Sequence, residues 1–258
     1  MKLKDKIAIV TGATKGIGVA IAQEFCKEGA KVVATGRTVE LGEKVISEIK
    51  AEGGDAIFVQ CDVSQKAQVD HLVKATVDHY GTIDIVVNNA GVNHSADFFD
   101  ITEEDWDWVM GVDLKGAFLM SQAGARVMVE QGKPGYIVNI SSIMAKMALR
   151  NQVAYCAAKG GVNQLTTAMG LALIDKGIRV NCVAPGPVVT ELMQKVVHNK
   201  EKSEELMRRL PIGYIAAPEE IASVCIFLSC DDASYMVGQT IYVDGGRGIQ
   251  AFPRALDQ

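Results

Sequence analysis

The stretch IAIVTGATKGIG, residues 7–18, decides the fold class. Its first four residues, Ile7 to Val10, form an apolar run that predicts a short buried strand, and a helix-like stretch follows the glycines. Gly12, Gly16 and Gly18 follow a G-x-x-x-G-x-G spacing, which differs from the commoner G-x-G-x-x-G fingerprint. Missing Cβ atoms would still let the backbone approach a pyrophosphate at the helix N-terminus. A tight strand-to-helix turn would also explain these glycines, but their place after the first strand favours a dinucleotide site.

The same alternation of apolar strands and helices continues along the chain. Further strands are predicted at 31–35, 56–59, 83–87, 136–140, 178–182 and 240–243, with helices at 39–51 and 64–80 among them. Continuous β-branched runs indicate strands buried on both faces, as in a parallel sheet. Right-handed crossovers then give an α/β, doubly wound, Rossmann-like sheet, whose ligands bind beyond the carboxyl ends of the strands. No long linker or repeat interrupts the pattern, so we expect one domain over residues 1–258.

Composition excludes several other classes of protein. Apolar residues make up 48% and charged residues 22%, as in an ordinary globular protein. The net charge of −5 without a Lys/Arg block gives little support for nucleic-acid or anionic-membrane binding. No long apolar run or signal peptide is evident, which predicts a cytoplasmic protein. The six cysteines form no CxxC pair, so we expect reduced thiols and no bound metal.

The residues after the second strand favour NADP over NAD. An acidic residue there would take the ribose hydroxyls and repel a 2′-phosphate, but residues 34–38 contain none. Arg37 can hold the phosphate with two hydrogen bonds, and Lys15 of the glycine loop could reach the same group. Either cation alone could be an ordinary solvated residue. After the third strand, Asp62 could accept a hydrogen bond from the adenine amino group.

Several motifs in order along the chain resemble the short-chain dehydrogenase/reductase family, in its single-domain branch. They are Thr11 to Gly18, Asn88-Asn89-Ala90-Gly91, Ser142, Tyr155-Cys156-Ala157-Ala158-Lys159 and Pro185-Gly186-Pro187-Val188-Val189-Thr190. The resemblance runs from Lys6 to Gly246 and implies a seven-stranded parallel sheet with three helices on each face. It also implies a homotetramer or homodimer, with residues 190–213 as a substrate lid.

The expected cofactor contacts combine the residues above with those that the resemblance implies. They are Gly12, Thr14, Lys15, Gly16, Ile17, Gly18, Arg37, Asp62, Val63, Asn88, Ala90, Gly91, Tyr155, Lys159, Pro185, Gly186, Val188 and Thr190. Asn88 has an alternative, structural role, in which its side chain only ties strand ends together. The cofactor is expected to be NADP, with NAD possible, and the other ligand a small-molecule substrate.

Tyr155, Lys159 and Ser142 are the candidate catalytic residues. Tyr155 and Lys159 are four positions apart on one helix, so they share a face. A free phenol has a pKa of about 10, but a nearby ammonium group favours the phenolate. Tyr155 could then accept a proton from an alcohol or donate one to a ketone. Ser142 follows the fifth strand and could hold the substrate oxygen, while the cofactor carries the hydride. An ordinary helix pair would explain Tyr155 and Lys159 alone, but not the added serine.

Asp113 is the point at which the sequence departs from the family pattern. The resemblance implies an asparagine here, whose backbone carbonyl helps to hold a proton-relaying water, but the chain has Asp113 within residues 112–116. We expect Asp113 to keep the backbone role, because Asn and Asp have nearly the same shape. The alternative is that its carboxylate couples to Lys159 and weakens the effect of that ammonium on Tyr155.

The substrate pocket is expected between Ser142 and Tyr155 and after Thr190. Met144, Gln152 and Met193 are its candidate residues, and the methionines favour an apolar, adaptable pocket unless they only pack helices. Three substrate classes stay open. A 3-oxoacyl thioester suits the apolar lining, and Lys133 and Lys176 lie near the positions at which related reductases dock a carrier protein. A sugar or polyol is favoured by residues 211–215 and 218–221, which resemble the corresponding segments of bacterial glucose 1-dehydrogenases. A hydroxysteroid is the third class, and a non-catalytic dinucleotide sensor is disfavoured because the catalytic residues are present.

Overall fold

The computed structural model describes every residue except 192, 194–198 and 251–258. It contains a seven-stranded sheet with the order β3-β2-β1-β4-β5-β6-β7, in which all neighbouring strands are parallel. The strands are β1 (Ile7–Thr11), β2 (Lys31–Gly36), β3 (Asp55–Gln60), β4 (Ile85–Asn88), β5 (Gly135–Ile140), β6 (Ile178–Pro185) and β7 (Thr240–Val243). This confirms the predicted doubly wound sheet. The strand order reverses between β1 and β4, which is where such sheets bind ligands.

Two strand boundaries differ from the prediction by two or more residues. The predicted strand at 83–87 begins later, at Ile85, where its pairing with Ala8 of β1 and Tyr136 of β5 starts. The predicted strand at 178–182 continues to Pro185, because its last residues pair with β7. Both differences come from pairing with distant parts of the chain, which local hydrophobicity does not record.

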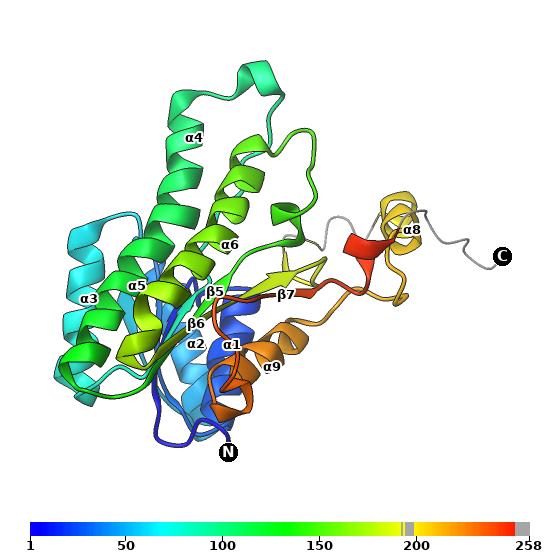
Figure 1. The fold of residues 1–258 in the computed structure, drawn as a ribbon. Helices are drawn as coiled ribbons and strands as arrows, with labels where there is room; N and C mark the ends of the chain where they lie inside the picture. The colour runs from blue at the N-terminus through cyan, green and yellow to red at the C-terminus, as the bar shows by residue number, and fades with distance from the viewer. Residues whose placement is uncertain (192, 194–198, 251–258) are drawn as a thin grey trace.

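Helices cover both faces of the sheet, and Figure 1 shows them packed around it. The larger helices are α1 (Ile17–Lys27), α2 (Val39–Ala51), α3 (Lys66–Tyr80), α4 (Glu103–Met110), α5 (Gly116–Glu130), α6 (Val153–Leu173), α8 (Lys200–Arg208) and α9 (Pro218–Leu228). Buried residues of α1, α2 and α9 share one core, and those of α3 and α5 lie in the other, against which Met169 and Leu173 of α6 pack. In the described part of the chain, three helices therefore cover each face, as the resemblance implied.

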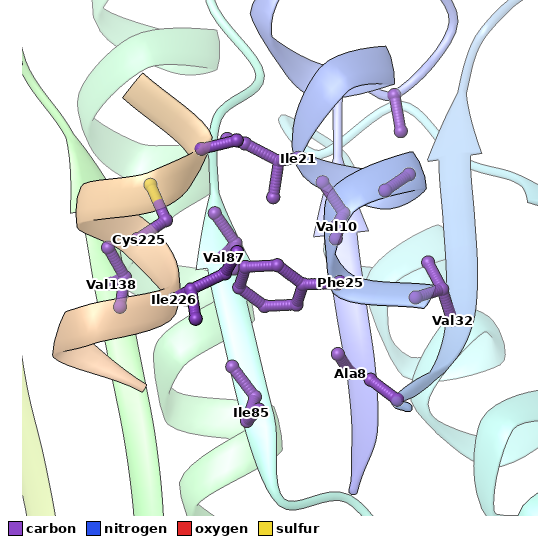
Figure 2. Close-up of a cluster of buried hydrophobic side chains, with 14 of the residues drawn as sticks. Ala8, Val10, Ile21, Phe25, Val32, Ile85, Val87, Val138, Cys225 and Ile226 are labelled. Carbon is purple, nitrogen blue, oxygen red and sulfur yellow. The ribbon is translucent and has the colours of Figure 1, made fainter. Parts of the chain in front are cut away.

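The strands supply buried side chains to both of these cores. Ala8 and Val10 of β1 belong to the core beneath α1 and α9, whereas Ile9 between them belongs to the opposite core. Figure 2 shows Phe25 of α1 and Ile226 of α9 facing one another above the sheet. Successive strand residues point to opposite faces, so a continuous apolar run buries all its side chains here.

The predicted lid, residues 190–213, is described only in part. Residues 192 and 194–198 lie outside the described residues, and the rest includes α8, which Figure 1 shows set apart from the helices that cover the sheet. None of the residues of α8 is buried. Its charges include ion pairs of Lys200 with Glu204 and of Glu205 with Arg209, as expected for a solvated face. Among the helices that the structure describes, none has the length and apolar character to cross a membrane.

Candidate active site

The glycine loop joins β1 to α1 in a conformation that only glycine accommodates well. Gly12 and Gly16 have φ angles of +64° and +59°. A Cβ atom on Gly18 would lie 2.3 Å from the carbonyl oxygen of Gly12, and one on Gly12 would lie 2.8 Å from Cα of Ala90. Gly16 is the N-cap of α1, and no side chain caps that helix. The first backbone N–H groups of α1 are therefore left for an external anion.

A cleft of about 550 Å³ lies along this loop and the carboxyl ends of β1 to β4. This volume is typical of small-molecule and cofactor sites. Its lining residues are Gly12, Thr14, Lys15, Gly16, Ile17, Gly36, Arg37, Thr38, Leu41, Cys61, Asp62, Val63, Asn89, Ala90, Gly91, Val92, Val112, Thr190 and Glu191. Most of the predicted cofactor contacts are thus brought together. The glycine cradle, the uncapped helix and the size of the cleft fit a dinucleotide.

The phosphate-binding candidates Lys15 and Arg37 lie on the same cleft. Both side chains are exposed, and neither takes part in an ion pair with another described residue. The backbone carbonyl of Arg37 accepts a hydrogen bond from the Gln60 side chain at 2.9 Å, which fixes the chain where β2 ends. The two cations are therefore available to an anionic group in the cleft.

Asp62 also lines the cleft, in a turn that holds its carboxylate in place. Its Oδ1 accepts hydrogen bonds from the backbone N–H and the hydroxyl of Ser64, at 3.0 and 2.7 Å. Oδ2 is then the oxygen that could accept a hydrogen bond from an amino group of a ligand.

Asn88 has the structural role that was left open as its alternative, whereas its contact with the cofactor stays a prediction. Asn88 is buried and donates hydrogen bonds to Ser121 Oγ and Asn139 Oδ1, both at 2.8 Å. Asn139 in turn donates to Thr166 Oγ1 at 2.8 Å. These bonds tie β4 and β5 to α5 and α6. The next residue, Asn89, lines the cleft and donates to the carbonyl oxygens at the end of β1.

Other predicted cofactor contacts are not among the residues that line the cleft. Gly18 is packed against the glycine loop, and a Cβ on Gly186 would lie 2.7 Å from Cα of Asp244. Val188 is buried and pairs with Ala216. Pro185 ends β6 beside β7. The cleft also includes residues that the sequence analysis did not assign: Gly36, Thr38, Leu41, Cys61, Asn89, Val92, Val112 and Glu191. Gly36, Cys61 and Asn89 lie at or directly after a strand end, which is the signal that could have identified these three.

Tyr155 and Lys159 lie in the first turns of α6, which is fixed against the end of β5. The ammonium group of Lys159 donates to the carbonyl oxygen of Ile140 at 3.1 Å, and the Ser141 hydroxyl donates to the Lys159 carbonyl at 3.0 Å. The same ammonium lies 5.6 Å from the ring centroid of Tyr155. Ser142 follows directly and begins a short 3₁₀-helix, η3 (Ile143–Ala145), which packs against α6. The three candidate catalytic residues therefore gather at one end of β5.

Asp113 lies in a short π-helix, η2 (Gly111–Lys115), inserted between α4 and α5. Its side chain is buried, and Oδ1 accepts a hydrogen bond from the backbone N–H of Val92 at 2.8 Å. Oδ2 lies 3.1 Å from Nζ of Lys159. The Asp113 carboxylate therefore forms a buried ion pair with Lys159, as in the alternative that the sequence left open, and the backbone role stays a prediction. π-Helical turns are frequent at functional sites.

This ion pair sets the charge state of Lys159. Burial favours the neutral amine, but the Asp113 carboxylate and Tyr155 outweigh that effect, and the pKa of Lys159 lies above its usual value. A Cβ atom on Gly91 would lie 3.2 Å from Asp113 Oδ2 and 3.3 Å from Lys159 Nζ. Gly91 also lines the cleft, so the ion pair lies directly behind its wall.

The predicted substrate residues occupy different environments. Met144 is buried, and its backbone N–H donates to the Ser142 hydroxyl at 3.1 Å. The Gln152 side chain is directed to Ser95 Oγ at 3.4 Å. Met193 is half-buried and lies one turn after Thr190, whose carbonyl accepts its backbone N–H at 2.9 Å. None of the three lines the cofactor-sized cleft.

Known proteins match this chain over nearly its whole length. A family model described as enoyl-(acyl carrier protein) reductase matches residues 12–247. Glucose 1-dehydrogenase 2 of Bacillus subtilis (strain 168) is 38% identical over 99% of this chain and 98% of its own. The 3-oxoacyl-acyl-carrier-protein reductase FabG of Thermotoga maritima is 38% identical over 95% and 99%. The structure of a gluconate 5-dehydrogenase from Burkholderia cenocepacia J2315, in complex with NADP and tartrate, has a TM-score of 0.90 and 34% identity, covering 95% and 96%.

Proposed function

The chain belongs to the short-chain dehydrogenase/reductase family, and from this we propose that it reduces ketone groups of acyl-type substrates with NADPH. It is an NAD(P)-dependent oxidoreductase that acts on CH–OH groups. The observation that carries the proposal is the placement of Tyr155 and Lys159 at the end of β5, beside a cleft with two unpaired cations.

The cofactor proposal rests on the charges of the cleft. Arg37 and Lys15 would hold the 2′-phosphate of NADP, and the uncapped start of α1 would face the pyrophosphate. The Asp62 carboxylate would accept a hydrogen bond from the adenine amino group. Among the proposed cofactor contacts, Asn89 takes the place of Asn88. The bound cofactor supplies the hydride.

The chain's own residues would position the substrate oxygen and provide its proton. The Ser142 hydroxyl accepts a hydrogen bond from the backbone N–H of Met144, so its own proton is free to bind that oxygen. Tyr155 would donate its phenolic proton to the same oxygen in reduction and take it back in oxidation. Lys159, held by Ile140 and Asp113, would provide the adjacent positive charge.

An apolar acyl chain fits the segment between Ser142 and Tyr155 better than a polyol does. Met147 and Leu149 are exposed in this segment. Its polar Gln152 is engaged with Ser95, and the Lys146 ammonium lies 5.5 Å from the ring centroid of Tyr242. Residues 190–213 would act as the lid over this substrate, as proposed from the sequence. The exposed Met147 and Leu149 favour burial of apolar groups.

A substrate panel with NADPH tests the proposed class. We expect kcat/KM for a short 3-oxoacyl-CoA to exceed that for a neutral sugar lactone or ketose by at least about tenfold, because apolar contacts discriminate by about 1–3 kcal/mol. A bulky 3-oxosteroid serves as the third compound. A higher kcat/KM with the sugar or the steroid would contradict the acyl assignment.

We also propose that the chain forms a homotetramer, or at least a homodimer. A second groove of about 470 Å³ runs between α5 and α6 and is lined by Phe118, Ala125, Val129, Met169, Ala172 and Leu173 among other residues. Phe118 lies in this groove with 42% of its surface exposed.

The free thiols of all six cysteines favour a reducing compartment such as the cytoplasm.

The Phe118→Glu substitution should disrupt this assembly, because it places a charge in an apolar contact. We expect light scattering to show an oligomer for the wild type and a smaller species for the variant. Val39→Glu is the matched control, since Val39 is 39% exposed but lies on α2. A monomeric wild type, or an equal loss of assembly in the control, would refute the proposal.

A further inference from the structure

We propose that Asp113 is a positioning residue that holds the Lys159 ammonium and restrains its attraction for the Tyr155 phenolate, so that the site favours proton donation to a ketone. This inference rests on the proposed acid/base role of Tyr155 and adds a preferred direction to it. Its basis is the buried contact between Asp113 and Lys159, together with the second contact that fixes the same carboxylate.

The carboxylate is held by two different partners at once. Oδ1 accepts the backbone N–H of Val92 at 2.8 Å, and Oδ2 lies 3.1 Å from the Lys159 ammonium. In the described residues, Oδ2 has no hydrogen-bond partner apart from this ionic contact. The π-helix η2 brings the side chain inward at this position. The orientation of Lys159 is thus set by Asp113 on one side and by the Ile140 carbonyl on the other.

An amide could not make the same pair of contacts. In the observed side-chain orientation, an asparagine would accept the Val92 N–H through Oδ1 and turn its NH₂ group toward the Lys159 ammonium. Two donors would then face one another at about the distance of a hydrogen bond. Turning the amide over would lose the Val92 contact instead. Only a carboxylate satisfies both donors, so the acid at position 113 matches its local structure.

The balance of charge around Lys159 gives the pair its consequence. The groups that act on it are Asp113 from η2, Tyr155 from α6 and Cys182 from β6. Burial raises the pKa of the Cys182 thiol to about 11, so it is neutral near pH 7. Asp113 therefore supplies the fixed negative charge, and the buried pair has no net charge. A neutral pair stabilises an adjacent phenolate less than a lone ammonium would.

The sign of this effect favours reduction. A ketone needs Tyr155 in its protonated form, whereas an alcohol needs the phenolate. By offsetting the charge of Lys159, Asp113 weakens the attraction of that ammonium for a phenolate at Tyr155. The reductive activity should therefore persist further into the alkaline range, and oxidation should require higher pH, than it would without the carboxylate.

The Asp113→Asn variant tests this inference through pH profiles in both directions. We expect the alkaline loss of ketone reduction and the alkaline gain of alcohol oxidation to move to lower pH by about one unit. A merely structural role would lower activity at all pH values without moving either profile. Profiles that stay in place or move to higher pH would overturn the inference.

A spectroscopic titration gives the same information without turnover. Phenolate formation at Tyr155 is isolated as the near-ultraviolet difference between each protein and its Tyr155→Phe counterpart. We expect the signal at lower pH in the Asp113→Asn protein, and an unchanged midpoint would contradict the inference. Asp84→Asn is the matched control, because Asp84 is also buried but binds the backbone of Ile7 at the other end of the sheet.

Two further measures keep the test decisive. If Asp113→Asn fails to fold, as judged by thermal melting, Asp113→Ser removes the charge with a smaller polar side chain and is titrated in its place. If the wild type reduces no ketone, the proposed function fails, while the titration still decides whether Asp113 controls Tyr155. The two failures are therefore distinguishable.

Discussion

Replacing Tyr155 with phenylalanine is expected to lower kcat for ketone reduction by about 10²–10⁴-fold, the range typical of a lost general acid. The substitution keeps the ring beside Lys159 and removes only the hydroxyl that donates the proton. Because the cleft and its glycine loop are unaffected, the Kd for NADPH, measured by fluorescence titration, should change little.

Tyr235→Phe is the control for this substitution, since Tyr235 is fully exposed and lies outside the site. Its kcat should equal that of the wild type. Near-normal turnover in the Tyr155 variant would remove Tyr155 from the acid/base role, and a parallel loss of NADPH binding would assign the residue to the cofactor site instead.

The Arg37→Asp substitution is expected to reverse the cofactor preference from NADP to NAD. It removes a phosphate ligand from the cleft and adds a charge that repels the 2′-phosphate. Loss of one charged hydrogen bond alone costs about 1.5–3 kcal/mol, or about 10- to 100-fold in kcat/KM with NADPH. Activity with NADH should stay level or rise, because the ribose hydroxyls gain an acceptor.

Lys50→Asp introduces the same change of charge at the other end of α2, away from the cleft, and should leave the preference unaltered. The decisive comparison is the ratio of kcat/KM for the two cofactors in each protein. A wild type that already prefers NADH would refute the assignment of Arg37 and Lys15.

The fold was predictable because its strands are buried on both faces. The run at 31–35, for example, contains no solvent-facing polar alternation, and the structure pairs it on both sides within the sheet. The glycine loop was predictable for a similar reason, since Gly12 and Gly16 occupy conformations that other residues rarely adopt. These features depend on neighbours in sequence, and so the sequence records them.

The sequence did not predict side-chain direction, because this depends on contacts between distant segments. Asn88 and Asn89 are successive residues, and no local pattern says which of them faces the cleft and which the buried network of Ser121 and Asn139. The direction of the Asp113 side chain was not predictable, because a π-helical turn interrupts the regular period of 3.6 residues. Its carboxylate consequently meets Lys159, forty-six positions along the chain (159 − 113).

The central claim is that this chain uses NADPH to reduce a ketone, with Tyr155 providing the proton. The most direct test is to incubate the wild-type protein with NADPH and a 3-oxoacyl-CoA, and to quantify the NADPH oxidised and the 3-hydroxyacyl-CoA formed. We predict equal amounts of both in the wild type, and a rate lower by about 10²-fold or more in the Tyr155→Phe protein. The claim would be contradicted if NADPH were consumed without hydroxyacyl product, or if the two proteins formed that product at the same rate.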